Sequence, residues 1–371
     1  MCPLFLLLFF QIVCVIFFLR RKRMSFGVYI HWPYCLSKCP YCDFFSRAVA
    51  PDKDLIGFYE REIQKLPRRQ VTSIFFGGGT PSLMALKDIE RILKAVSDRC
   101  SIASDVEISL EANPNAIDLS KMKALRRLGV NRLSLGIQSL RDESLRFLGR
   151  HHDAATAKKR IEQMRRVFDN CSIDLMYALP FHTPAAWQEE LGQALRYDLP
   201  HYSLYQLTIE EGTPFARQTI PQIAEEVGRE LFLQTLDQME AAHKPWYEVS
   251  NFAKKGFACR HNLGYWTGKD YAGIGPAAHG RYGCTATENP RSVALWKQNG
   301  GQVTHLTKAE RFEEKLLMGL RLRRGFSTDS LSDRTIREAV NNGWVVQHKR
   351  KITLTREGLL MLNPLTVLLC P

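Results

Sequence analysis

The sequence lacks the features that mark several common classes of protein. Its ten cysteines cluster only once, and no second pair of closely spaced cysteines is present. Isolated thiols do not make a disulfide framework, which indicates a reducing compartment and a single functional cysteine site. No basic segment interleaved with aromatic residues is present, so nucleic acid is the least favoured class of partner. The isolated cysteines are at positions 2, 14, 100, 171, 259, 284 and 370.

Positive charge is in excess and is widely spread along the chain. The 371 residues carry a net charge of +13, and the run RRKR at 20–23 supplies four of these charges. A spread excess suits an anionic ligand, and it also suits peripheral association with an anionic membrane surface. The chain length and a hydrophobic content of 45% predict one large globular domain with a smaller appendage.

Residues 1–23 form an apolar and then basic N-terminal segment. Its charge-free run PLFLLLFFQIVCVIFFL is just long enough to cross a bilayer, and no small-residue cleavage site follows. Two interpretations stay open. The segment is a membrane anchor whose basic flank keeps the folded part in the cytoplasm, or translation starts at Met24 and the segment is not made. We favour the second, because nothing downstream needs an anchor, and we expect a cytoplasmic protein, either free or at the inner membrane face.

From residue 27 onwards, β-branched or aromatic runs alternate with amphipathic segments. This pattern predicts a parallel sheet with crossover helices, either open or closed into a barrel, and places the ligand site at the carboxyl ends of the strands. The expected strands are 27–32, 71–76, 106–111, 131–137, 172–177 and 202–207. The expected helices are 54–65, 86–99, 118–128, 154–168, 185–197 and 222–242.

The alternation ends near residue 243, which divides the chain into a core domain at 24–242 and a C-terminal domain at 243–371. Glycine-rich and aromatic sequence at 259–283 is followed by a helical stretch at 308–323. The last forty or so residues read as helix, strand, strand, helix, which predicts a small α+β, winged-helix-like module.

The cysteine cluster lies in HWPYCLSKCPYCDFFS, with thiols at Cys35, Cys39 and Cys42. A structural zinc site would need a fourth ligand. Cys39 and Cys42 alone resemble a glutaredoxin-type dithiol, but that interpretation leaves Cys35 unexplained. A 4Fe-4S cluster uses all three thiols and keeps one iron open for a small chelating ligand.

The spacing C-x3-C-x2-C after the first strand, with GGGTP at 77–81 after the second, resembles the radical S-adenosylmethionine (SAM) superfamily. The resemblance implies that the open iron chelates the amino and carboxylate groups of SAM. It also implies a full or partial barrel, which with six strand-helix units is a partial (β/α)6 radical-SAM barrel. The glycines allow the backbone to approach a ligand closely and to donate amide hydrogen bonds to it.

Further motifs resemble one branch of this superfamily, which contains oxygen-independent coproporphyrinogen III oxidases and HemW-type haem chaperones. They are SLEANP, RLSLGIQS, LGRHH and IDLMYALP, and the resemblance runs from residue 27 to about 360. Glu111 and Asp174 suit an amine or ribose hydroxyls, and Arg150 suits a carboxylate. The resemblance implies that SAM contacts Tyr29, Tyr41, Gly78, Gly79, Thr80, Glu111, Gln138, Arg150 and Asp174.

Two departures favour the chaperone over the oxidase. The oxidase pattern has a further cysteine where this chain has Phe44, and it has an extended arm before the first strand. The chaperone interpretation implies haem as ligand, a haem-acceptor protein as partner, a monomer or homodimer, and no catalytic residue. The oxidase, which decarboxylates coproporphyrinogen III through a SAM-derived radical, is the alternative, and a dithiol oxidoreductase is the third candidate.

The C-terminal part contains HNLGYW at 261–266, which resembles a motif of the chaperone branch. His261 is therefore a candidate ligand of haem iron, with Tyr265 and Trp266 packing on the porphyrin. Ordinary packing between domains is the alternative explanation of this motif. His279, in the glycine-rich GPAAHG, either serves the site or caps its loop.

Overall fold

The computed structural model describes residues 26–370. The N-terminal segment 1–23, predicted to be an anchor or not to be translated, lies outside this range. Between residues 26 and 370, no helix combines the length and apolar character needed to cross a membrane.

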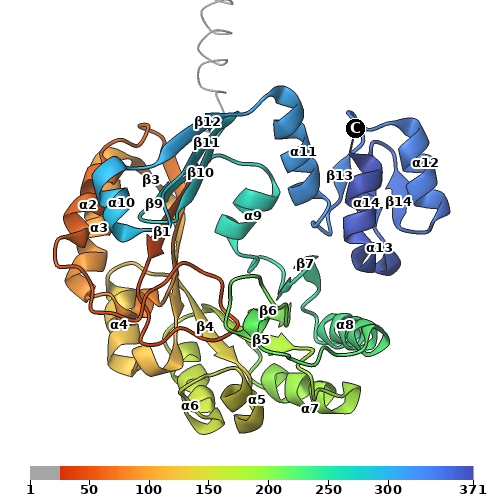
Figure 1. Ribbon diagram of the computed structural model, residues 1–371, viewed down its shortest axis with the longest axis horizontal. Helices are drawn as coiled ribbons and strands as arrows, with labels where there is room; N and C mark the ends of the chain where they lie inside the picture. The colour runs from red at the N-terminus through yellow and green to blue at the C-terminus, as the bar shows by residue number, and fades with distance from the viewer. Residues whose placement is uncertain (1–25, 371) are drawn as a thin grey trace, which may run out of the picture.

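Six parallel strands lie side by side in chain order, each joined to the next through helices on the outer face of the sheet (Figure 1). All five neighbouring pairs among them are parallel, as predicted. The strands are β1 (Phe26–Trp32), β2 (Gln70–Gly78), β3 (Ser101–Ala112), β4 (Arg132–Gln138), β5 (Asn170–Tyr177) and β6 (His201–Gln206). The helices are α2 (Leu55–Ile63), α3 (Leu86–Arg99), α4 (Leu119–Arg127), α5 (Asp142–Phe147), α6 (Ala154–Arg165), α7 (Pro184–Leu195) and α8 (Glu225–Ala241).

The barrel is partial, because β6 does not pair with β1 and each carries other strands instead. The expectation of a partial (β/α)6 barrel is therefore confirmed. At the β6 edge lie β8 (Asn251–Ala253) and β7 (Trp246–Glu248), both antiparallel.

At the other edge, β9 (Tyr271–Ile274) pairs in parallel with β1 and continues the sheet. The sequence analysis did not predict it or the three antiparallel strands beyond it. These are β10 (His279–Tyr282), β11 (Thr285–Glu288) and β12 (Gln302–His305), with α9 (Arg260–Trp266) and α10 (Val293–Asn299) nearby in the chain. The sheet therefore runs across the division expected at residue 243.

The end of the chain forms a small module with its own apolar core, at the side of the molecule in Figure 1. Its helices surround a three-stranded antiparallel sheet in the order β13-β15-β14, so the expected α+β module is confirmed. The helices are α11 (Lys308–Gly319), α12 (Asp333–Asn341), α13 (Arg356–Leu360) and α14 (Leu362–Leu369). The strands are β13 (Phe326–Ser327), β14 (Val345–His348) and β15 (Lys351–Leu354).

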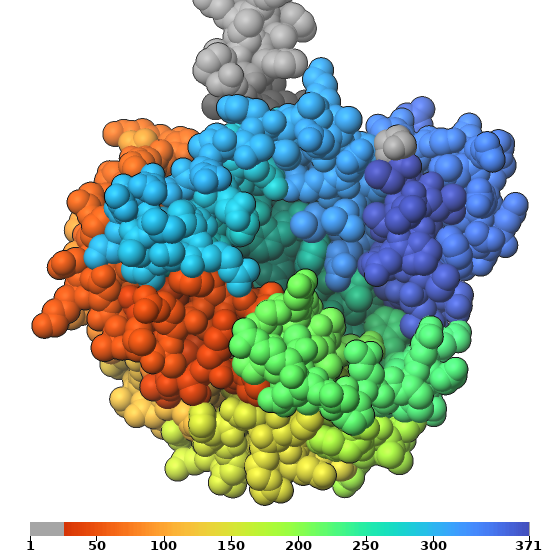
Figure 2. Space-filling model, in the orientation of Figure 1, coloured from red at the N-terminus to blue at the C-terminus, as the bar shows by residue number. Residues whose placement is uncertain are grey.

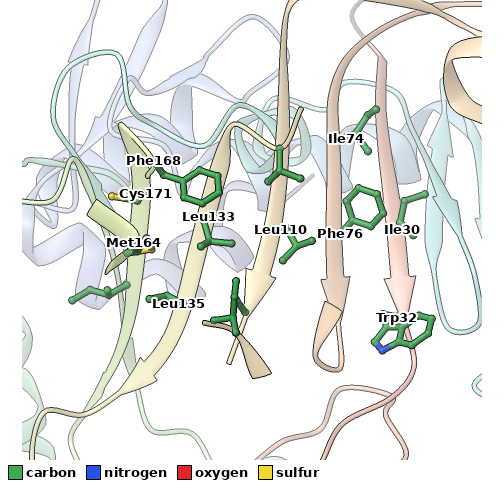
Figure 3. Close-up of a cluster of buried hydrophobic side chains, with 14 of the residues drawn as sticks. Ile30, Trp32, Ile74, Phe76, Leu110, Leu133, Leu135, Met164, Phe168 and Cys171 are labelled. Atoms are coloured by element: carbon green, nitrogen blue, oxygen red, sulfur yellow. The ribbon is translucent and has the colours of Figure 1, made fainter. Parts of the chain in front are cut away.

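The main core lies between the parallel strands and the helices that cover them. Figure 3 shows Ile30, Phe76, Leu110 and Leu133, from four neighbouring strands, in this layer. All four are fully buried. Successive side chains of a strand point to opposite faces, so the residues between these apolar positions face the interior of the barrel. On that face lie Tyr29, His31, Ser109, Glu111, Ser134 and Asp174. The residue alternation thus gives the partial barrel an apolar outer layer and a polar interior.

Candidate functional site

The three clustered cysteines lie on the loop between β1 and α2, which is held at both its base and its tip. At the base, Cys35 N donates to Arg47 O at 3.0 Å, and Arg47 N donates to Pro33 O at 2.9 Å. At the tip, Phe215 N donates to Pro40 O at 2.9 Å. All three cysteines are free thiols of intermediate exposure, and all line one cavity of about 390 Å³, which we call the cysteine cavity.

The glycine-rich turn at the end of β2 packs directly against this loop. Gly79 N donates to Trp32 O at 2.7 Å, and Thr80 N donates to Tyr34 O at 2.9 Å. A Cβ at Gly79 would lie 2.6 Å from Tyr34 O, and Gly78 has φ +105°, so neither position accommodates a larger residue without displacement. The glycines therefore allow two strand ends to meet.

Two side chains donate to the cysteine sulfurs, one from the turn after β2 and one from the segment between α5 and α6. Thr80 Oγ1 donates to Cys35 Sγ at 3.5 Å, and Arg150 Nη1 donates to Cys39 Sγ at 3.3 Å. Arg150 is fixed by a second bond, from Nη2 to Gly136 O at 2.7 Å. Burial raises the pKa of Cys42 to about 11, so binding of a metal would displace a proton from this thiol.

Two buried carboxyl groups face the same cavity from β3 and β5. Asp174 Oδ1 accepts a hydrogen bond from Ser134 Oγ at 3.0 Å. Burial, and secondarily the neighbouring Asp174, raise the pKa of Glu111 to about 8. Burial also raises the pKa of Asp174. Gln138, the last residue of β4, has φ +69°, an uncommon backbone conformation for a residue other than glycine. A ligand with a cationic or donor group would be favoured here.

The raised pKa of Glu111 predicts a dependence of stability on pH. Its pKa rises from an ordinary value of 4.5 to about 8 in the folded protein. The carboxyl group therefore stabilises the fold fully below pH 4.5, and this contribution is lost as pH rises through 8. We expect Glu111→Gln to flatten the fall in unfolding free energy over this window, by up to about 1.4 kcal/mol per pH unit. Urea unfolding of the ligand-free protein at several pH values measures this pH dependence of the unfolding free energy.

Glu90→Gln is the matched control, because Glu90 is exposed on α3. It should leave the pH profile unchanged. If Glu111→Gln and wild type gave parallel profiles between pH 5 and 8, Glu111 would not be the titrating group.

The structure brings the predicted SAM residues together, with one exception. The cysteine cavity is lined by Tyr41, Gly78, Gly79, Thr80, Glu111, Gln138, Arg150 and Asp174. Tyr29 lies instead on a neighbouring cavity, also of about 390 Å³, which we call the basic cavity. The two cavities share part of their lining, namely Asp43, Phe44, Gly78 and Glu111. Phe44 is 57% exposed at this shared wall.

The basic cavity was not foreseen from the sequence. It combines aromatic side chains from α9 and β9 with five cationic side chains from the C-terminal half of the chain. Figure 2 shows a recess on this face between the cysteine loop, in red, and the later segments, in blue. Only the glycine-rich, aromatic sequence at 259–283 gave a signal for it. The cationic residues are Lys269, Arg281, Arg291, Arg311 and Lys315.

His261, the predicted haem ligand, lines neither of these cavities. It lies on α9 with only 2% of its surface exposed. Its Nδ1 is 2.9 Å from Ser73 Oγ, and its Nε2 is 2.7 Å from Tyr265 Oη. Burial lowers the pKa of His261 to about 3. Both ring nitrogens are thus occupied, one by a hydrogen bond to β2 and the other by a hydrogen bond within α9, and this geometry favours the packing alternative over iron ligation.

The cysteine cavity fits an iron–sulfur cluster better than a single metal ion. Among residues 26–370, no three histidine, cysteine or acidic side chains are arranged to hold one ion. In a 4Fe-4S cluster each thiolate binds a different iron, so the three sulfurs surround a cube instead of converging on one point. Three free thiols on one cavity wall, with donors to two of the sulfurs, are consistent with that ligand set.

Comparisons with known proteins agree with this arrangement. A family model described as the radical SAM superfamily matches residues 29–194. "Radical S-adenosyl methionine domain-containing protein 1, mitochondrial" from Mus musculus is 34% identical, with 93% of this chain and 87% of that protein covered. "Heme chaperone HemW" from Bacillus subtilis (strain 168) is 32% identical, with 91% of this chain and 97% of that protein covered. The structure of the coproporphyrinogen III oxidase HemN from Escherichia coli has a TM-score of 0.80 at 20% identity, covers 95% of this chain and 91% of that chain, and shows the same fold.

Proposed function

This chain belongs to the radical SAM superfamily, in the family of the HemW-type haem chaperones, and from this we propose that it binds haem and transfers it to an acceptor protein. We propose that it carries a 4Fe-4S cluster and an exchangeable SAM. The observation that carries the proposal is the match along nearly the whole length of a protein named as a haem chaperone.

The cluster and SAM are assigned to the cysteine cavity. Cys35, Cys39 and Cys42 would ligate three irons, and the open iron with SAM supplies one-electron chemistry when both are bound. The side chains and backbone around the cavity would position the cluster and SAM. Arg150 places a positive charge 3.3 Å from Cys39 Sγ, which suits a thiolate ligand, and the glycine turn brings the backbone after β2 onto the wall of the same cavity.

The choice of chaperone over oxidase rests on Phe44. The oxidase-like pattern has cysteine at this position, whereas here an exposed aromatic ring stands at the wall between the two cavities. A phenyl ring can neither ligate a cluster nor transfer a proton. We therefore propose no catalytic residue. We also propose that the protein acts in the cytoplasm or at the inner membrane face, as a monomer or homodimer.

Anaerobic purification and cluster reconstitution, followed by two assays on one sample, test the function. We expect titration with haem to give a stable Soret band, and the loaded protein to pass haem to an apo-acceptor. Incubation with coproporphyrinogen III, SAM and a reductant should give no protoporphyrinogen. Turnover to protoporphyrinogen would support the oxidase, and absence of a Soret band would overturn the haem proposal.

A further inference from the structure

The basic cavity has the mixed lining of a ligand site for a large, partly apolar anion. Aromatic rings are contributed by β1, by the loop after Cys42, by α9 and by β9, and Met318 is contributed by α11. Its volume of about 390 Å³ lies within the range of small-molecule sites. Flat aromatic side chains suit the faces of a planar macrocycle. The rings belong to Tyr29, Phe44, Phe45, Tyr265, Trp266 and Tyr271.

The side chains that line the basic cavity carry more positive than negative charge. Five cationic side chains face three acids. Glu314 is already bonded, accepting from Arg281 Nε at 2.8 Å and forming an ion pair with Arg311. Burial raises the pKa of Glu111 to about 8, which leaves its carboxyl mostly neutral at pH 7. The cavity therefore favours an anion.

Several donors on this wall have no partner within the described range. Arg281 Nη1 and Arg311 Nε are buried and make no hydrogen bond there, although Arg311 is only 6% exposed. Within residues 26–370, the ammonium groups of Lys269 and Lys315 form no ion pair or side-chain hydrogen bond. Buried donors are normally satisfied, so orphaned guanidinium nitrogens in a cavity indicate a carboxylate or similar ligand group.

Two histidines line this cavity, His31 and His279, and they differ in whether the ring is accessible. His31 Nε2 donates to Phe45 O at 2.9 Å, and its Nδ1 lies 3.1 Å from Tyr29 Oη. His261 has both nitrogens bonded and lies outside the cavity. His279, at the start of β10, is exposed, lines the cavity and makes no ring hydrogen bond to residues 26–370. Neutral imidazole is a common axial ligand of haem iron.

We propose that the basic cavity is the haem site, with His279 as the iron ligand and Lys269, Lys315 and Arg311 as partners of the two propionates. This inference rests on the proposed function and adds to it the place where haem binds. The shared wall at Phe44 then sets the haem next to the cysteine cavity.

Titration of the reconstituted protein with ferric haem tests the iron ligand. We expect His279→Ala to weaken haem binding by about tenfold or more, consistent with loss of a strong ligand, and to shift the Soret maximum. Free imidazole should restore the wild-type spectrum, which a merely structural role of His279 would not produce. His348→Ala, an exposed histidine on β14, is the matched control and should behave as wild type.

A second titration tests the propionate partners with haem and haem dimethyl ester as probes. Wild type should bind the ester several-fold more weakly, because the ester lacks both carboxylates. In Lys269→Gln/Lys315→Gln, haem affinity should fall towards that of the ester, and ester affinity should change little. Equal losses for both probes would contradict a role in carboxylate binding.

The outcomes separate this inference from the function on which it rests. No Soret band with wild-type protein would overturn both. Wild-type binding that persists unchanged in His279→Ala, but is lost in His261→Ala, would leave the chaperone function standing and overturn the site proposed for haem.

Discussion

Replacing Cys35, Cys39 or Cys42 singly with alanine is expected to abolish the iron–sulfur absorbance of the anaerobically reconstituted protein. The three thiols lie on one short loop and line one cavity. Each is assigned to a different iron, so no remaining thiol can replace a lost one, and we expect bound iron to fall by about tenfold or more. Visible absorbance, iron content and electron paramagnetic resonance of the reduced protein measure the loss.

Two other cysteines serve as controls for this experiment. Cys284 is exposed and Cys100 is buried between α3 and β3, and neither lines the cavity. Alanine at either position should leave the cluster signal at the wild-type level. If the Cys35→Ala protein showed dithiol oxidoreductase activity that survived removal of iron, the dithiol interpretation would be supported instead, because it needs only Cys39 and Cys42.

Glu107→Ala is expected to lower the free energy of unfolding by about 1–3 kcal/mol for each backbone donor that it leaves without a partner, and Glu107 accepts from two such donors. Glu107 lies on the inner face of β3 and is 2% exposed. Its carboxylate accepts from the backbone N–H groups of Arg260 and His261, each at 3.1 Å. The substitution would leave both backbone donors without their acceptor and would remove one of the negative charges near the buried Arg132. Urea denaturation measures the change.

The same substitution should also weaken haem binding, because Glu107 holds the start of α9. That helix carries Tyr265 and Trp266 into the basic cavity. Glu90→Ala, on the exposed face of α3, is the control and should change stability by no more than about 0.5 kcal/mol. Similar unfolding midpoints for Glu107→Ala and Glu90→Ala would show that the buried contacts add no net stability.

The cysteine cavity is the part of the protein that could be predicted best. The cysteine loop and the glycine turn follow strands directly, Gln138 ends β4, and Glu111 and Asp174 lie in the second halves of β3 and β5. Parallel neighbours bring their carboxyl ends to one edge, so the local strand pattern was sufficient to predict that these residues meet. Arg150 was assigned only through a family motif, since α5 before it gave no clear signal.

The basic cavity could not be predicted from local sequence patterns. It requires β9 to pair with β1, although more than 200 residues separate the two strands in the chain. β9 and β10 have four residues each, too few for a clear periodic pattern. The hydrogen bond of His261 depends on the same kind of long-range contact, because its partner Ser73 lies 188 residues earlier.

The sequence by itself determined the order of the parallel strands, the polar interior of the barrel and the gathering of three thiols at its edge. These features depend on residue alternation and on short spacings, which act within a few residues. Only the tertiary structure decided which side chains of the last 130 or so residues face the cysteine loop, because that depends on long-range strand pairing and on the packing of α9 and α11. It thereby placed His279, and not His261, on the open cavity.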